Sequence, residues 1–104
     1  MEEGDGAAAL GSGDVPVLGT PRLVALAEEA TVAAVGPVLG SAETSVGVRV
    51  EIDHLRATPI GDTVTVDAML SHVDGRRLTF EIGATDSGGT VARGKVVRVV
   101  VDRE

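Results

Sequence analysis

The sequence predicts an α+β domain in which one long buried helix packs on an antiparallel β-sheet. Two observations carry this prediction. Residues 20–37 form a mostly apolar stretch with start and stop signals typical of a helix, and four later runs alternate apolar with polar residues. Short turn sequences join these runs, so the strands are expected to be antiparallel and to lie on one side of the helix.

At 104 residues the chain is long enough for one domain. Residues 1–14 are rich in Gly, Ala and acids, and we expect them to form a loose N-terminal arm. Residues 15–104 are then expected to form the single folded domain.

The helix is expected to start at Thr20, a good N-cap residue, because Pro21 suits the first helical position. The Gly36-Pro37 pair is expected to end it. Almost all of its positions are apolar, so the helix is predicted to be buried on most sides. Glu28 is the exception on a stripe that is otherwise apolar, and this makes it a candidate functional residue.

The first predicted strand covers Ser45–Arg56. Val46, Val48, Val50 and Ile52 alternate with polar residues or glycine and so are assigned to one buried face. Continuing the count places His54 on that face, where the next apolar residue would stand. Because no cysteine is available, His54 is the first candidate for acid–base chemistry near neutral pH.

Three further strands follow a turn at residues 58–62. The second strand has its apolar face at Val64–Leu70, and Asp74-Gly75 is a strong hairpin signal before the third. The fourth strand, Val91–Asp102, places Arg98 among small apolar residues. The strands are predicted to form a meander that leaves the last strand at an open edge, which a second copy would cover to form a homodimer.

Composition excludes several classes of function. The formal charge of −7 and the single aromatic, Phe80, argue against a nucleic-acid surface or an anionic membrane surface. The absence of cysteine and the presence of only two histidines argue against a metal centre. No apolar run is long enough for a membrane span, so a cytoplasmic protein without a cofactor is expected.

One group of residues resembles a known family. Thr20, Glu28 and His54, together with residues 54–66 (HLRATPIGDTVTV) and 73–78 (VDGRRL), are similar to the fluoroacetyl-CoA thioesterases. The resemblance implies the hotdog fold, hydrolysis of a small acyl-CoA by a homodimer that could pair into a tetramer, and a catalytic set of Thr20, Glu28 and His54. It further implies that Gly47 and Arg98 line or support the site. The family's aromatic lid segment before the threonine is missing here, since residues 11–19 contain no phenylalanine.

The chemistry of these residues fits thioester hydrolysis. Glu28 is a candidate base or nucleophile, and His54 can move a proton or orient Glu28. Thr20 lies at the start of the helix, where free backbone N–H groups would stabilise an oxyanion. Eight residues of helix span about 12 Å, so Thr20 and Glu28 cannot hydrogen-bond along one straight helix. They act at different points of the substrate, or the first turn is distorted, or one contributes across a dimer interface. Positive charge for the CoA phosphates is expected near the hairpin and the last strand, where Arg93 and Lys95 also lie, and Arg76 and Arg77 are the chosen candidates.

Each residue also has a simpler explanation. Thr20 can be an N-cap alone, Glu28 can pair with Arg98, and His54 can be a hydrogen-bonded histidine of the core. Arg76 and Arg77 can be solvated residues at a hairpin end. The alternative functions are therefore a hotdog domain that binds acyl-CoA without turnover, and a structural dimer module.

Overall fold

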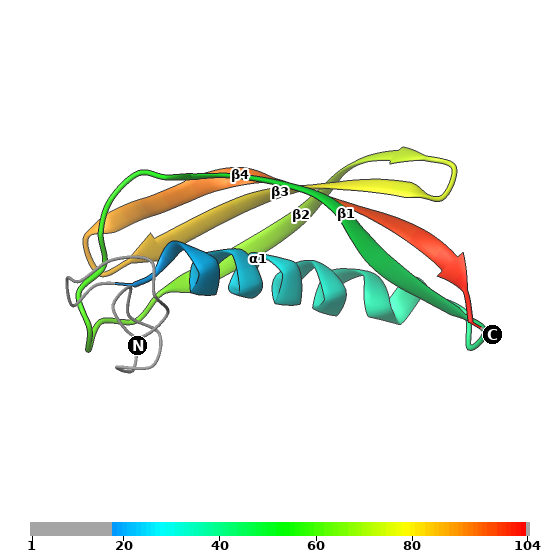
Figure 1. The fold of residues 1–104 in the computed structure, drawn as a ribbon, viewed down its shortest axis with the longest axis horizontal. Coiled ribbons are helices and arrows are strands. Elements are labelled where there is room, and N and C mark those ends of the chain that lie inside the picture. Colours follow the sequence, from blue (N-terminus) through cyan, green and yellow to red (C-terminus); the bar gives the residue numbers. More distant parts are fainter. Residues whose placement is uncertain (1–17, 104) are drawn as a thin grey trace.

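The computed structural model describes residues 18–103, and it confirms one helix packed on an antiparallel sheet. Figure 1 shows the helix lying under one face of a strongly twisted sheet. The elements are α1 (Thr20–Val35), the short 3₁₀ helix η2 (Gly36–Val38), β1 (Glu43–His54), β2 (Thr65–Asp74), β3 (Arg77–Asp86) and β4 (Gly89–Asp102). The predicted arm, residues 1–14, lies outside the described residues. No helix within residues 18–103 is long and apolar enough to cross a membrane.

The strand order is β1-β4-β3-β2, so the prediction of a simple meander was wrong. Strands β2, β3 and β4 do follow one another through tight turns, and Gly75, with φ of 60°, begins the turn between β2 and β3. The first strand instead pairs with the last. The physical reason is the long loop of residues 55–64, which can reach about 33 Å and has to cross only three strand spacings of about 4.8 Å each.

This topology corrects the prediction of which strand lies at an edge. The last strand, β4, is hydrogen-bonded on both sides and lies inside the sheet. The edges of the described sheet are β1 and β2. An edge strand presents free N–H and C=O groups, so β1 and β2 are the strands that could pair with another chain.

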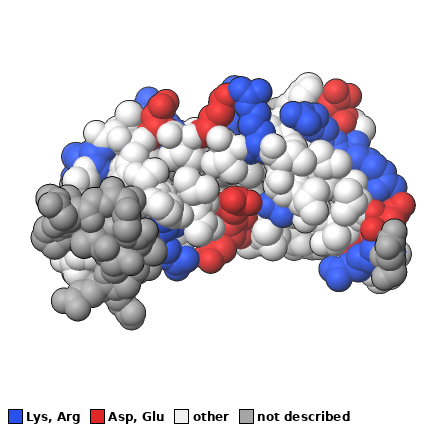
Figure 2. Space-filling view, in the orientation of Figure 1, with Lys and Arg blue, Asp and Glu red and all other residues white. Residues whose placement is uncertain are grey.

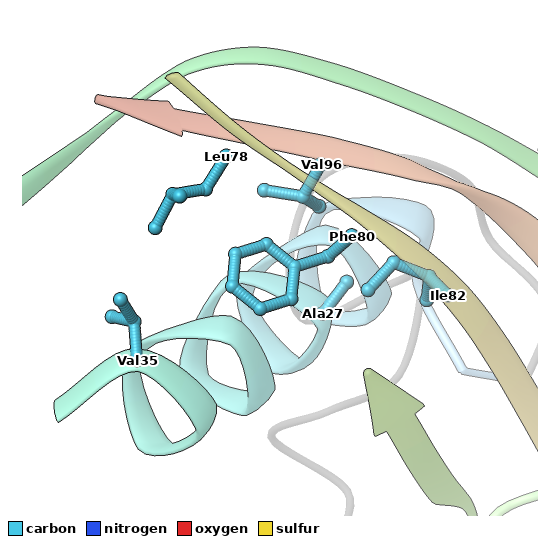
Figure 3. Close-up of a cluster of buried hydrophobic side chains, with 6 residues drawn as sticks. All are labelled: Ala27, Val35, Leu78, Phe80, Ile82 and Val96. Carbon is cyan, nitrogen blue, oxygen red and sulfur yellow. The ribbon is translucent and has the colours of Figure 1, made fainter. Parts of the chain in front are cut away.

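The core forms between one stripe of α1 and the inner face of the sheet. The buried helix residues recur every four positions, which keeps them on one side of the helix: Leu23, Ala27, Thr31 and Val35. The third strand alternates as predicted, and Figure 3 shows Phe80 pointing from β3 toward the helix between Leu78, Val96 and Ala27. A second buried cluster, which includes Leu18, Leu23 and Val91, lies at the start of the helix.

Two predictions about the helix were wrong for the single chain. Val32 is 50% exposed, so α1 is not buried on most sides. Figure 2 shows uncharged surface on both sides of a small group of charged side chains near the middle of the face that carries β1 and α1. The N-cap is Gly19, and its backbone rather than the Thr20 side chain starts the helix. Thr20 is thus the first helical residue, and its hydroxyl is available for another partner.

A β-bulge in β1 changes which residues face the helix. Gly47 pairs with Arg98 and Arg49 pairs with Val97, so Val48 is an extra residue between them. Because of this extra residue, the inward-facing positions before the bulge are out of step with those after it. Val50 and Ile52 pack against the core as predicted, but Val46 is 45% exposed and Gly47 takes the inward position near the helix.

Candidate active site

The helix start and the end of β1 meet in a hydrogen bond between two of the candidate residues. The Oγ1 atom of Thr20, the first residue of α1, lies 3.0 Å from Nδ1 of His54, the last residue of β1. The other imidazole nitrogen, Nε2, is buried and has no hydrogen-bond partner among the described residues. A buried polar atom without a partner is costly, and such atoms often mark functional sites. The contact with Thr20 thus orients the imidazole, and its second nitrogen stays buried without a partner in the described part of the chain.

Backbone hydrogen bonds bring these two elements together. The N–H of Leu18 donates to the carbonyl of Thr58 at 2.8 Å, which ties the chain before α1 to the loop after β1. In the same loop, the N–H of Leu55 donates to the carbonyl of Val91 at 2.7 Å. Thr20 and His54 therefore lie on segments that are each anchored within two residues of the hydrogen bond.

Glu28, Gly47 and Arg98 form a second cluster halfway along the helix. The Glu28 carboxylate lies 3.8 Å from Nη1 of Arg98, and a Cβ atom on Gly47 would be 2.7 Å from Glu28 Oε2. The Arg98 side chain is only 7% exposed, as its position among small apolar residues predicted. The Glu28 side chain is 42% exposed in the single chain, so it is not the buried carboxylate that the helix pattern indicated.

The Arg98 guanidinium is held by groups other than Glu28. Its Nε donates to Ser45 Oγ at 2.9 Å, and its Nη2 donates to the Ser45 carbonyl at 3.1 Å. Nη1 also approaches Thr31 Oγ1 at 3.5 Å. Sequence reasoning missed Ser45, because the bulge that turns it inward leaves no clear signal in the sequence. This support fixes a buried positive charge beside the Glu28 carboxylate.

The two clusters are separate within one chain. Thr20 and Glu28 are eight residues apart on a straight helix, or about 12 Å. His54 and Gly47 are seven residues apart on β1, or about 23 Å. The single chain therefore brings Thr20 to His54 and Glu28 to Gly47 and Arg98, but it does not bring Glu28 to His54.

Arg76 and Arg77 lie at the turn between β2 and β3. Arg76 donates to the Val100 carbonyl and to the Asp102 carboxylate, both at 3.3 Å. Arg77 lines a surface depression of about 270 Å³ together with Arg49 and Lys95, on the sheet face opposite the helix. Neither arginine contacts the Thr20–His54 pair or the Glu28 cluster. Among the described residues, no group of His, Asp and Glu side chains could hold a metal ion.

A buried carboxylate that sequence reasoning missed contacts the loop that follows His54. Asp86, at the end of β3, accepts hydrogen bonds from Arg56 and from Thr58. Burial opposes its ionisation, but these hydrogen bonds, another from the Gly88 N–H and the Arg56 charge outweigh burial and lower its pKa. The only sequence signal was a polar residue before a glycine turn, which is common on protein surfaces.

Comparisons with known proteins were made for the sequence and for the fold. The family model described as fluoroacetyl-CoA-specific thioesterase matches residues 2–104. The fluoroacetyl-CoA thioesterase of Streptantibioticus cattleyicolor is 40% identical over 88 residues, which is 85% of this chain. The match covers 63% of that relative, so this chain spans less than two thirds of its length.

Two solved structures extend the comparison to the fold. A mutant of the fluoroacetyl-CoA-specific thioesterase FlK in complex with fluoroacetate and CoA has a TM-score of 0.89 at 33% identity, covering 98% of this chain and 86% of that chain. A hot-dog-like protein from Thermanaerovibrio acidaminovorans has a TM-score of 0.90 at 27% identity, covering 98% and 76%. These similarities confirm the fold and the resemblance on which the site residues were chosen. The chain belongs to the fluoroacetyl-CoA-specific thioesterase family and has its hotdog fold.

Proposed function

We propose that this protein hydrolyses the thioester of a small acyl-CoA, with Thr20, Glu28 and His54 as its catalytic residues. The observation that carries the proposal is the Thr20–His54 hydrogen bond, which leaves the buried Nε2 of His54 without a partner. Family membership supports the same reaction. Water is consumed, the bond between the carbonyl carbon and sulfur breaks, and the products are a carboxylic acid and the free thiol of CoA.

His54 is suited to moving the proton that this reaction requires. Nδ1 is engaged by Thr20, and this contact fixes the orientation of the ring. Nε2 then faces the substrate and can donate a proton to the departing sulfur or polarise the carbonyl. The Thr20 hydroxyl lies at the start of α1, where free backbone N–H groups favour the developing oxyanion.

Glu28 supplies the carboxylate of the catalytic set. It acts as a general base on water or as a nucleophile on the carbonyl carbon. The buried Arg98 guanidinium lies 3.8 Å from the Glu28 carboxylate, and Gly47, which has no side chain, leaves the space that this carboxylate fills. Arg98 and Gly47 are therefore proposed as residues that line and support the site.

Because Glu28 and His54 are apart in one chain, we propose that the working enzyme is a homodimer. The free edge of β1, with Val46 and Val48 half exposed, can pair with the same strand of a second copy. If two β1 strands pair antiparallel about the midpoint between Val50 and Glu51, Gly47 comes opposite the partner subunit's His54. The partner's His54 then lies beside Glu28, and each dimer has two complete sites.

The CoA phosphates need positive charge, for which Arg76 and Arg77 are proposed. Arg77, Arg49 and Lys95 line one depression together with Glu51, which pairs with Arg49, and guanidinium groups pair well with phosphate oxygens. We also propose a cytoplasmic location, which suits a chain without cysteines and therefore without disulfides.

The test is thiol release from a panel of short, branched, aryl and fluorinated acyl-CoA esters. The parent protein is compared with His54→Ala and Glu28→Ala, and with His72→Ala as a matched control because His72 is exposed on β2. We expect turnover of at least one ester, a loss of at least about a hundredfold in kcat for the first two variants, and no change for the third. In the same assay, Arg76→Gln and Arg77→Gln are expected to raise KM and leave kcat unchanged.

The same experiment separates the alternatives. If no ester releases thiol but CoA esters bind in calorimetry, the chain is a binding domain. If the esters neither react nor bind, the chain is a structural dimer module. Turnover that is indifferent to both His54→Ala and Glu28→Ala would contradict the assignment of the catalytic residues.

A further inference from the structure

We propose that Asp86 is a positioning residue that holds Thr20 and His54 in hydrogen-bonding geometry. The inference rests on the proposed function, since it assigns a role toward that catalytic pair. Asp86 is the last residue of β3, and its hydrogen-bond partners are Arg56, Thr58 and Gly88 rather than Thr20 or His54. It would act through the two segments that carry them.

The Asp86 carboxylate accepts hydrogen bonds from three donors that surround it. Its side chain is 1% exposed. Oδ1 accepts from the Arg56 guanidinium and, at 2.8 Å, from the backbone N–H of Gly88. Oδ2 accepts from the Thr58 hydroxyl at 2.9 Å. A buried carboxylate is stable only when such donors surround it, and here they come from two different parts of the chain.

One branch of this network leads to Thr20. Thr58, whose hydroxyl is held by Asp86, uses its backbone carbonyl to accept the N–H of Leu18 at 2.8 Å. Leu18 is itself buried and precedes Thr20 by only two residues. The position of Thr58 therefore sets where α1 begins, and with it the position of the Thr20 hydroxyl.

The other branch leads to His54. Arg56, only two residues after His54, donates to Asp86 and also to the Gly89 carbonyl at 3.2 Å. The backbone N–H of Arg56 donates to the Val91 carbonyl at 3.2 Å. These contacts fix the chain where it leaves β1, and so they fix the direction of the imidazole.

The network matters because the pair it holds is joined by a single hydrogen bond. Thr20 and His54 are 34 residues apart and belong to different elements, and their side chains meet only through the 3.0 Å contact. A small displacement of either segment would lengthen that contact and release the imidazole ring. Displacements of about 1 Å in a catalytic group can cost about a hundredfold in rate.

The test replaces Asp86 by Asn, which keeps the volume but removes the charge and one acceptor. The matched control is Asp102→Asn, which breaks an exposed Asp–Arg pair at the other end of the fold. The nitrogen resonances of His54 are recorded by NMR for each variant at the same pH. Thr20→Val, which lacks the hydroxyl, gives the reference spectrum for a lost hydrogen bond.

We expect the His54 Nδ1 resonance of Asp86→Asn to move toward its position in Thr20→Val, while Asp102→Asn keeps the parent spectrum. With an ester that the parent turns over, kcat is expected to fall about tenfold with KM within about twofold. A folded Asp86→Asn protein with the parent His54 resonances would overturn the proposal, as would a resonance shift of the same size in Asp102→Asn.

A second variant and a measurement that needs no turnover keep the test decisive. If Asp86→Asn does not fold, Thr58→Val replaces it, because this variant deletes only the donor hydroxyl and leaves the carbonyl that holds Leu18. A smaller shift of the Nδ1 resonance in the same direction is expected, and an unchanged resonance would refute the proposal. The NMR measurement needs no turnover, so the absence of thioesterase activity would refute the proposed function without deciding the role of Asp86.

Discussion

Gly47 is the residue whose replacement tests the Glu28 cluster most directly. It occupies the inward position before the bulge in β1, and the space where a Cβ would stand is already taken by the Glu28 carboxylate at 2.7 Å. The Arg98 guanidinium is 3.4 Å from the same point. Both neighbours are the far ends of flexible side chains. An added methyl group would therefore displace the carboxylate and not the backbone.

We predict that Gly47→Ala lowers kcat/KM for the best ester by about tenfold. The free energy of unfolding should change by no more than about 1 kcal/mol, because flexible side chains can move aside. Gly83→Ala on β3 is the matched control, since nothing lies within 4 Å of its added Cβ. Steady-state kinetics and urea unfolding measure both quantities. Equal activities of the two variants would contradict the assigned role of Gly47.

Among the structural elements, the loop of residues 55–64 is tied to the turn between β3 and β4 through carboxylates. Its side chains are held against the turn between β3 and β4 by Asp86, and by Asp62, which accepts from the Ser87 hydroxyl at 2.7 Å. Hydrogen bonds from Ser87 and from the Thr63 N–H lower the pKa of Asp62 below its ordinary value of 3.8. For Asp86, the donors outweigh the opposing effect of burial and also lower the pKa.

These pKa shifts predict a loss of stability in acid. A carboxylate whose pKa is lower in the folded state stabilises the fold above its unfolded pKa, and this contribution disappears as the pH falls through the folded pKa. We expect the parent protein to be more stable than Asp86→Asn near pH 7, and the difference to shrink below about pH 4. Urea unfolding across this pH range measures the difference. A gap that stays constant down to about pH 2 would contradict the prediction.

For the whole molecule, the main consequence is that one chain holds two incomplete halves of the proposed site. The half with Thr20 and His54 lies at the start of the helix, while the half with Glu28 and Arg98 lies near its middle. The free edge of β1 runs past both halves. Pairing of two such edges would join complementary halves and cover the exposed valines.

We predict that Val48→Lys gives a monomer without thioesterase activity, since Val48 is 49% exposed on the β1 edge and a charge there opposes pairing. Val73→Lys is the matched control, because Val73 is 55% exposed on the other edge strand, β2. It should keep the parent mass and activity. Light scattering after size exclusion measures the mass. A dimeric Val48→Lys protein would exclude the proposed use of this edge.

Much of the fold could be predicted from local patterns. The limits of α1, the alternation of β3 and the burial of Arg98 follow from periodicity and turn residues, which are properties of short segments. The position of His54 on the inner face also followed from the alternation. The alternation gave the wrong face for the residues before the bulge. One extra residue in the strand exchanges the inward and outward positions on its two sides, and the sequence pattern does not reveal it.

The sequence by itself therefore determined the helix, the four strands, their approximate limits and the family to which the chain belongs. Only the tertiary structure decided that β1 pairs with β4, that Thr20 bonds to His54 instead of capping the helix, and that Asp86 supports both of their segments. The physical reason is the range of the interactions. Hydrophobic periodicity and turn propensity act over a few residues, whereas these contacts join residues about 30 to 60 positions apart, whose meeting depends on how the whole chain packs.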